Sequence, residues 1–444
     1  MRGRRPCRRP FLHERGVHSR PEMRQVAPCM PLNPTRSAAF ALVTAVLERR
    51  RGLDEALDSL PGHIQPRDKA AAHRIAAAVL RRLGSIDAVL EPYLRREPSP
   101  PALQALRIGA AELLLLGTPA HAAVGTAVAL APKPFAGLVN AVLRKVATEG
   151  PAALEGLDAA RLDTPAWLWT SWHAAYGPKV RAIAEAHTLP APLDLSLAPG
   201  AAAPEGAEIL PNGTARLPAG TRITELPGFA EGAFWAQDAA ASLPARLLAA
   251  RPGERVADLC AAPGGKTAQL ATTGAAVTAV EKEERRATRL RENLARLKLQ
   301  AELVVADAIP WSAERRGSFD AVLLDAPCTA TGTIRRHPEV PHLRRARDVP
   351  KLAATQVALL EAAAGLLAPG GRLVLATCSL QPEEGEAHMA RLAALGLRPD
   401  PVRPEEVPGL EAAITPDGAL RTRPDFWVEK GGMDGFFVAR FLRG

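Results

Sequence analysis

Aromatic residues are scarce in this sequence and make up 4% of its 444 residues. Proteins that bind single-stranded nucleic acid by base stacking rely on several exposed aromatic side chains. The shortage argues against such a stacking platform. If the partner is a nucleic acid, we expect its recognition to depend on charge and shape.

Cysteine is also rare, and the five cysteines include no CxxC pair. An odd number without that spacing argues against a disulfide framework or a zinc ribbon and fits a reducing cytoplasm. Long apolar runs are missing too, because no stretch approaches ~20 uninterrupted apolar residues. We therefore expect a cytoplasmic protein with no membrane span and no bound metal.

Positive charge is concentrated near the N-terminus. Residues 1–35 hold eight arginines and two acidic residues, whereas the whole chain has a net charge of +9. The rest is only mildly basic, which permits a polyanionic partner without requiring one. No apolar core of a secretion signal follows the paired arginines. An Arg-rich transit peptide is one interpretation, but we favour a disordered tail or a start codon assigned too early, with Met23 or Met30 as the true start.

Three regions with different patterns follow. Residues 36–149 have apolar residues at three- and four-residue spacing and predict an all-helical bundle. Residues 150–235, with scattered proline and glycine, predict a linker and a small α/β segment. In residues 236–444 short apolar strands alternate with glycine loops and helices, which predicts a mostly parallel, doubly wound α/β sheet. Such sheets bind ligands at the carboxyl ends of their strands.

The glycine-rich segment DLCAAPGGKT, residues 258–267, follows the first strand of this sheet and opens a helix. Its GGKT end resembles half of a nucleoside triphosphatase P-loop. That motif needs glycine where this chain has Cys260, and Pro263 lacks an N–H for a phosphate. The spacing also fails the GxGxxG pattern of dinucleotide binders. A Rossmann-like loop for a different nucleoside cofactor fits better.

Two acids end the next two strands. Glu281 lies about twenty residues past the loop, where a carboxylate can accept hydrogen bonds from both ribose hydroxyls of a nucleoside. Asp307 ends the third strand, where an acid can meet an adenine amino group. Either acid alone is more often a helix cap or a solvated strand end. Their succession favours a nucleoside site.

Two thiols also lie just beyond strands. Cys328 follows Asp325 in the Asp-Ala-Pro-Cys segment, and Cys378 follows a neighbouring strand in a Thr-Cys-Ser segment. An isolated cysteine is usually a small buried hydrophobe, and we interpret Cys260 in that way. Two thiols that converge at the ligand-binding edge of a sheet are harder to explain by packing alone.

Two thiols beside such a cofactor make chemical sense for one reaction. Carbon 5 of cytosine is too poor a nucleophile to attack a methylsulfonium, but a thiolate added at carbon 6 turns the ring into an electron-rich enamine. A carboxyl group at the ring-nitrogen edge eases this attack, and Asp325 is placed for it. A second weakly acidic group can help when the thiolate is expelled. The residues alone do not rank Cys328 and Cys378.

At this point the chain resembles the RsmB (Sun, Fmu) group of bacterial small-subunit ribosomal RNA cytosine-C5 methyltransferases. The resemblance runs from Arg36 to the end and is carried by DLCAAPGGKT, LLDAPCTATGTIRRHPEV and ATCSLQPEEGE. It implies a NusB-like all-α RNA-binding domain followed by a Rossmann-like class I methyltransferase domain that uses S-adenosylmethionine. The expected substrate is a cytosine of 16S ribosomal RNA, at a position-967-type site, and we expect a monomer.

The resemblance also implies residue roles. Cys378 would be the nucleophile and Cys328 the release cysteine, with Asp325 and Lys266 completing the catalytic set. Many relatives carry Asp where this chain has Glu281, and Ala306 replaces a common Gly, which puts fine geometry in doubt. The implied contacts to S-adenosylmethionine and the adjacent base are Cys260, Ala261, Ala262, Pro263, Gly264, Gly265, Lys266, Glu281, Asp307 and Asp325.

Contacts to RNA are expected from two regions. Arg335, Arg336 and His337 would hold phosphates near a flipped-out base. The helical domain offers weaker candidates, because charged helix faces are usually just solvated. These candidates are Arg36, Arg67, Lys69, and Arg81 or Arg82.

Two other function classes stay open from the sequence. The helical domain could carry the function of an RNA-binding assembly or antitermination factor with a vestigial catalytic half. The intact Cys328, Cys378, Asp325 and glycine loop speak against such decay. Alternatively, the methyltransferase could act on another RNA such as tRNA, on DNA or on a protein.

Overall fold

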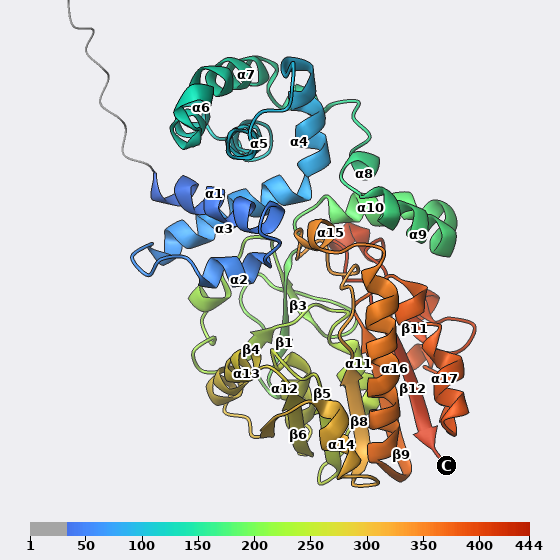
Figure 1. The fold of residues 1–444 in the computed structure, drawn as a ribbon. Coiled ribbons are helices and arrows are strands. Elements are labelled where there is room, and N and C mark those ends of the chain that lie inside the picture. The colour runs from blue at the N-terminus through green and yellow to red at the C-terminus, as the bar shows by residue number, and fades with distance from the viewer. Residues whose placement is uncertain (1–32) are drawn as a thin grey trace, which may run out of the picture.

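The computed structural model describes residues 33–444, so Met23, Met30 and nearly all of the N-terminal segment lie outside the described residues. The first part is a bundle of seven helices, which we call the helical domain (Figure 1). Its helices are α1 (Pro34–Leu47), α2 (Leu53–Asp58), α3 (Pro66–Arg81), α4 (Leu83–Leu90), α5 (Pro100–Leu114), α6 (Ala120–Leu130) and α7 (Ala136–Glu149).

Local sequence sets the ends of these helices, and small apolar residues set their packing. Asn33 caps α1 by accepting a hydrogen bond from the Arg36 N–H, and proline opens α1, α3 and α5. At Gly109 of α5, an added Cβ would lie 2.3 Å from a methyl group of Leu143 in α7. Glycine therefore lets α5 and α7 pack closely around an Ala-, Leu- and Val-rich core.

The connecting region holds more helix than the sequence predicted. Three short helices come first, and then a small antiparallel sheet in the order β2-β3-β1-β4. The elements are α8 (Ala159–Leu162), α9 (Ala166–Tyr176), α10 (Val180–His187), β1 (Leu193–Leu197), β2 (Glu208–Ile209), β3 (Ala215–Leu217) and β4 (Phe234–Ala236).

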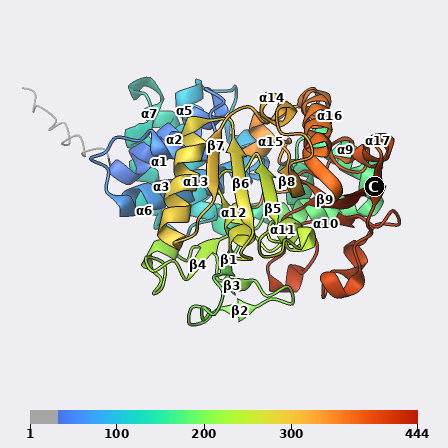
Figure 2. The ribbon, with the colours of Figure 1, turned by 90° about the horizontal axis from the view of Figure 1, so that it is seen from below.

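The C-terminal part is built on a large sheet in the order β10-β12-β9-β8-β5-β6-β7, with β11 paired to β12. Figure 2 shows the run of strands from β9 through β8, β5 and β6 to β7. The five strands from β9 to β7 are parallel, and the strands at the β12 edge are antiparallel. The predicted mostly parallel sheet is therefore confirmed. Its strands are β5 (Arg255–Leu259), β6 (Ala276–Glu281), β7 (Glu302–Val305), β8 (Phe319–Asp325), β9 (Leu367–Thr377), β10 (Leu397–Pro399), β11 (Leu420–Arg421) and β12 (Phe437–Arg443).

Helices cover both faces of this sheet because side chains alternate along each strand. Val256 of β5 packs against one layer of helices, and Ala257 packs against the other. The first layer is α11 (Leu243–Leu248), α12 (Gly265–Ala271) and α13 (Glu284–Leu297). The second is α14 (Ala308–Ala313), α16 (Asp348–Leu366) and α17 (His388–Ala394). None of the helices between residues 33 and 444 is long and apolar enough to cross a membrane.

The helical domain contacts the loop that runs from Cys328 to α15 (Val340–Leu343). Arg81 donates a hydrogen bond of 3.1 Å to the Arg335 carbonyl, and Arg50 donates to the carbonyls of His342 and Leu343. His342 Nε2 lies 2.8 Å from the Leu80 carbonyl. The helical domain is thus fixed directly to a loop that begins at one of the two converging thiols.

The Arg335 side chain does not face solvent, so the expectation that it binds RNA phosphates is wrong. Its guanidinium is 2% exposed and donates to Asp434 at 3.0 Å, to Asp238 at 2.5 Å and to the Gly431 carbonyl at 2.7 Å. Arg336 also donates to Asp434, at 2.7 Å from its Nε. This buried network ties the Cys328 loop to the small sheet and to the segment that precedes β12.

Removing Asp434 should destabilise the sheet domain strongly. We expect Asp434→Ala to lower the free energy of unfolding by about 3–5 kcal/mol, because Arg335 would keep a buried charge with one of its two acids gone. Urea unfolding followed by circular dichroism measures this. Glu225→Ala, which breaks the exposed Arg222–Glu225 pair, should cost less than about 1 kcal/mol. Equal losses in the two variants would contradict this account of the network.

Candidate functional site

The two thiols expected at adjacent strand ends lie side by side. Asp325, the last residue of β8, pairs with Ala376 of β9, so the segments that leave the two strands start at the same level. Cys328 and Cys378 follow, and their Sγ atoms are 3.4 Å apart. Parallel pairing of β8 and β9 is therefore what brings together two residues fifty positions apart in the chain.

The two cysteines have different surroundings. Cys328 is 7% exposed, and the pKa of its thiol is raised well above the usual range by its hydrogen bond to Cys378 and by burial. Cys378 is only partly buried. Cys328 is thus the thiol that keeps its proton, which leaves Cys378 as the accessible sulfur.

A buried cation pairs with the acid that ends β8. Lys266 Nζ lies 2.7 Å from Asp325 Oδ2 and 5.2 Å from the centre of the Phe436 ring. Burial lowers the pKa of Lys266, but Asp325 outweighs this and the pKa is raised overall, with a smaller contribution from Cys378. Lys266 therefore stays charged within electrostatic reach of both the acid and the accessible sulfur.

The glycine loop passes between β5 and α12 under tight backbone control. Cys260 has a φ of +60°, Gly264 has a φ of +102°, and the Ala261 N–H donates to the carbonyl of Val280 in β6. Burial raises the pKa of the Cys260 thiol to about 12, and the side chain packs against an apolar cluster below the sheet edge. Its packing supports the interpretation of Cys260 as a residue that lines the loop.

Glu281 holds this loop from the end of β6. Its side chain is 3% exposed and accepts hydrogen bonds from the Ala262 N–H at 3.3 Å and the Glu283 N–H at 3.0 Å. Arg286 lies 3.4 Å away and donates to the Ala262 carbonyl. The predicted acid is thus placed directly beside the glycine loop.

Asp307 lies two residues past β7, where it caps α14. It accepts from the Ile309 N–H at 3.1 Å and pairs with the exposed Lys282 at 2.7 Å. These two hydrogen bonds lower the pKa of Asp307, the Lys282 bond contributing most. The helix-cap role that the sequence left open is present here, beside any role in binding a ligand.

The first residue of the loop is an acid to which the sequence assigned no role. Asp258 is fully buried, its Oδ2 accepts from Thr267 Oγ1 at 2.6 Å, and its Oδ1 has no hydrogen-bond partner. Burial raises its pKa to about 7. An unpartnered buried acceptor at the carboxyl end of β5 is suited to a ligand that brings a donor.

Most arginines expected to bind RNA have protein partners instead. Arg36 pairs with the buried Glu112 at 2.6 Å, Arg82 pairs with Asp163 at 2.8 Å, and Arg81 donates to the sheet domain. These side chains are held by partners within the protein, and a contact of theirs with RNA stays a prediction. Arg67 is exposed, and the side chains of Arg336 and His337 are about a third exposed, although Arg336 also bonds Asp434.

Glu384 is a site residue that the sequence did not single out. It lies in a 3-10 helix, Pro382–Glu384, and is fully buried. It accepts hydrogen bonds from Thr329, Ser379 and Gln356, and so touches the residue that follows each of the two converging cysteines. The sequence could have pointed to Glu384 only through its position six residues after Cys378 in the ATCSLQPEEGE segment. The adjacent Glu383 stands in the same segment, so the position alone does not select one of the two acids.

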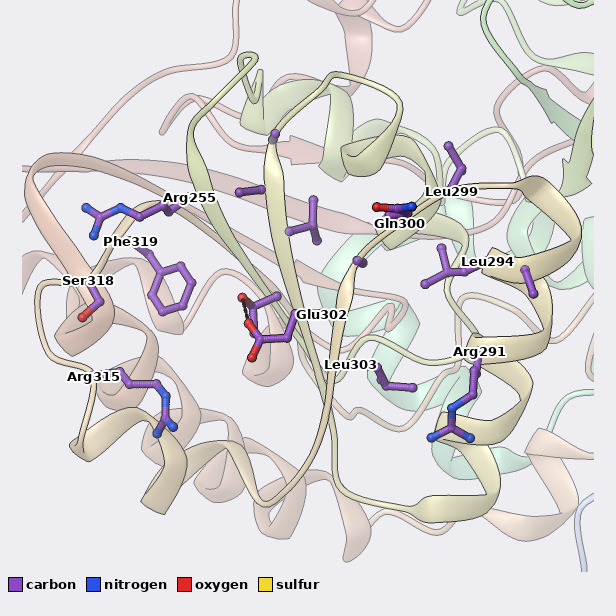
Figure 3. Close-up of a pocket in the computed structure, with 16 residues that line it drawn as sticks. Arg255, Arg291, Leu294, Leu299, Gln300, Glu302, Leu303, Arg315, Ser318 and Phe319 are labelled. Carbon is purple, nitrogen blue, oxygen red and sulfur yellow. Dashed lines mark hydrogen bonds between the residues drawn. The ribbon is translucent and has the colours of Figure 1, made fainter.

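A hollow lies at the opposite end of the strands, away from the two cysteines. Its volume is about 1050 Å³, and its lining includes Arg255, Phe319 and Glu302, which stand at the amino ends of β5, β8 and β7 (Figure 3). Doubly wound sheets use their carboxyl ends for ligands, so we assign the site to the cysteine edge. Among residues 33–444 no group of three or more His, Cys, Asp and Glu is arranged to hold a metal ion.

Comparison with protein families gives two matches along the chain. A family described as 16S rRNA methyltransferase RsmB/F matches residues 245–442. The NusB family matches residues 33–148, the range of the helical domain. A ribosomal RNA small subunit methyltransferase B from Pseudomonas putida is 36% identical over 93% of this chain and 99% of its own length.

Solved structures share the fold. PH0851 covers 93% of this chain and 99% of its own length with a TM-score of 0.70 at 22% identity. A methyltransferase homolog protein from Pyrococcus horikoshii covers 62% of this chain and 94% of its own, with a TM-score of 0.53 at 29% identity. The first match extends through both the helical and the sheet domain.

The raised pKa of Asp258 predicts a pH dependence of stability. The buried protonated form contributes stability that is complete below about pH 4 and is lost as the pH rises to about 7, by up to about 4 kcal/mol. Asp258→Asn has no proton to lose, so its stability should fall less than that of the wild type between pH 4.5 and 7.5. Urea unfolding at several pH values tests this.

The matched control is Asp320→Asn, an exposed acid of the same sheet that pairs with Arg255. It should leave the slope of stability against pH over that interval close to the wild-type slope. Parallel curves for the wild type and Asp258→Asn would overturn the assignment.

Proposed function

Because this chain belongs to the RsmB/F family of 16S rRNA methyltransferases, we propose that it methylates carbon 5 of a cytosine in 16S ribosomal RNA. The enzyme is an S-adenosylmethionine-dependent RNA methyltransferase, and we propose a covalent link between Cys378 and the base during the reaction. The target would be a position-967-type cytosine, and the enzyme would work in the cytoplasm as a monomer.

One observation carries the proposal of a covalent mechanism. Two thiols lie 3.4 Å apart at the carboxyl ends of adjacent strands, beside the Lys266–Asp325 pair. Methylation of cytosine carbon 5 needs a thiolate that attacks carbon 6, a carboxyl group at the ring-nitrogen edge eases that attack, and a second thiol can assist release. An assembly factor with a decayed catalytic half would have no use for this arrangement.

In the proposed reaction Cys378 bonds to carbon 6 of the cytosine, since Cys328 is the thiol that keeps its proton. Asp325, held by Lys266, acts as the carboxylic acid that donates its proton to the ring nitrogen while negative charge builds there. Carbon 5 then accepts the methyl group and its proton leaves to water. The ring nitrogen returns its proton to Asp325 as the bond between carbon 6 and the Cys378 sulfur breaks. Cys328 stabilises the departing thiolate through the contact between the two sulfurs.

The residues at the loop fit S-adenosylmethionine, which supplies the methyl group when bound. The unpartnered Oδ1 of Asp258 would accept from the amino group of its methionine part, and Glu281 would bond the ribose hydroxyls. Asp307 would lie by the adenine. Its carboxylate is held in place by hydrogen bonds from Lys282 and from the Ile309 N–H. The remaining proposed contacts are Cys260, Ala261, Ala262, Pro263, Gly264, Gly265, Lys266 and Asp325.

RNA would approach from the side where the helical domain contacts the sheet domain. Arg336 and His337 remain the proposed phosphate contacts near the target base, because their side chains are 34% and 36% exposed. Arg336 also lies within electrostatic reach of Cys378. Burial acts to lower its pKa, but Asp434 and Asp238 raise it overall, and Cys378 adds to the rise.

Substitution of the two cysteines tests the mechanism. Cys378→Ala should be inactive and form no protein–RNA adduct, because it lacks the sulfur that attacks. Cys328→Ala should accumulate a covalent adduct with RNA, because release of the attacking sulfur is impaired. Denaturing gels with labelled 16S RNA and S-adenosylmethionine measure both, with Glu225→Ala as the control that keeps both reactive thiols and every proposed cofactor contact. Adduct formation by Cys378→Ala and none by Cys328→Ala would reverse the assigned roles.

The substrate can be tested in cells. Bisulfite sequencing of ribosomal RNA from a deletion strain should show the loss of one 5-methylcytosine from 16S RNA, and the wild-type gene should restore it. A gene that carries Cys378→Ala should not restore it. An unchanged 16S map, with a methylated cytosine lost from tRNA instead, would contradict the proposed substrate.

A further inference from the structure

A single buried carboxylate joins the two cysteine loops. Thr329, next to Cys328, donates its N–H to Glu384 at 3.0 Å and also its hydroxyl. Ser379, next to Cys378, donates its hydroxyl to the same carboxylate at 2.6 Å. Glu384 is therefore bonded to the residue that follows each thiol, and the spacing of the two sulfurs depends on it.

A third contact fixes the carboxylate to the helix behind the site. Gln356 of α16 donates its amide to Glu384 at 3.3 Å and to the Pro327 carbonyl at 2.9 Å. His388 Nε2 lies 2.7 Å from Gln356 Oε1, so the ring donates there and turns the Gln356 NH₂ group toward Glu384. The chain from His388 through Gln356 to Glu384 thus ends on the two loops that carry the cysteines.

Among residues 33–444 no cation forms an ion pair with this carboxylate. Its hydrogen-bond partners are backbone N–H, hydroxyl and amide groups, all of them neutral donors. The nearby cation Arg421 pairs instead with Glu386 and with the Ser379 carbonyl. A buried negative charge that is held only by dipoles interacts strongly with nearby ionisable groups, because little solvent screens it.

The charge of Glu384 acts on the Cys328 thiol. The pKa of that thiol is raised first by its hydrogen bond to Cys378, then by burial and Cys378, and further by Glu384. Burial raises the pKa of Glu384 itself, and its hydrogen bonds from Ser379 and Thr329 oppose that rise. The other titratable and charged groups packed around the carboxylate are His388, Arg421 and Glu386. In its ionised form Glu384 therefore disfavours a second thiolate next to Cys378.

We propose that Glu384 is a positioning residue that fixes the two cysteine loops at their working separation and keeps Cys328 as a thiol, so that Cys378 is the sulfur that attacks. This proposal rests on the proposed function, because it assumes that one thiol attacks and the other assists release. Glu384 itself need not touch RNA or cofactor, since both of its oxygens are occupied by protein donors.

Glu384→Gln tests the proposal, since it removes the charge and replaces one acceptor by a donor that faces the Thr329 and Ser379 groups. We measure iodoacetamide alkylation of each cysteine against pH by mass spectrometry, in the full chain without RNA or S-adenosylmethionine. The ratio of Cys378 to Cys328 labelling should fall at least about tenfold in Glu384→Gln. In a methylation assay kcat should fall by a similar factor, with KM for RNA changed less than about threefold.

Glu383→Gln is the matched control, because Glu383 is the adjacent acid of the same 3-10 helix and is exposed. It should keep the wild-type labelling ratio and kcat. If Glu384→Gln does not fold, Ser379→Ala removes only the bond on the Cys378 side and should shift the ratio in the same direction by a smaller factor. A wild-type ratio in either folded variant would overturn the proposal.

The labelling readout separates this proposal from the proposed function. A shifted ratio in an enzyme that does not methylate 16S RNA would leave the role of Glu384 standing and remove the substrate. Methylation of 16S RNA together with an unshifted labelling ratio would keep the proposed substrate and remove the role of Glu384.

Discussion

The structure depends most on the guanidinium of Arg335, which is buried between Asp238 and Asp434. Its side chain joins segments that flank the small sheet and β12, and its backbone carbonyl receives Arg81 from the helical domain. One residue therefore couples the internal arrangement of the sheet domain to the attachment of the helical domain. Both couplings act on the loop that starts at Cys328, so the geometry of the thiol pair and the relative position of the two domains cannot vary independently.

The elements that could be predicted from sequence are those set by local periodicity. Short apolar runs that alternate with glycine loops and helices located the parallel strands. The carboxyl ends of those strands located Cys328, Cys378, Asp325 and Glu281. Glu384 could not be found in this way. Its burial is caused by Thr329, Ser379 and Gln356, which only the tertiary fold brings together, and sequence gives no reason to prefer it to its neighbour Glu383.

The same limitation explains the arginines that were assigned to RNA. A charged residue on a helix or loop looks equally available to solvent whether or not an acid faces it in the fold. Arg36 meets Glu112 from seventy-six residues away, and Arg335 meets Asp434 across ninety-nine. The number of arginines in the sequence therefore overstates how many are free to meet a polyanion, since several are already paired with acids inside the protein.

The attachment of the helical domain has a consequence for how the two halves can change over evolutionary time. Arg50 and Arg81 bind the carbonyls of His342, Leu343 and Arg335, and a carbonyl is present whatever side chain stands at the position. The Leu343 side chain can therefore change under other selective pressures without loss of its bond, whereas Arg50 cannot, and Arg335 and His342 are held by their own side-chain bonds. Divergence between homologues should accordingly be greater at Leu343 than at the residues that use their side chains across this boundary.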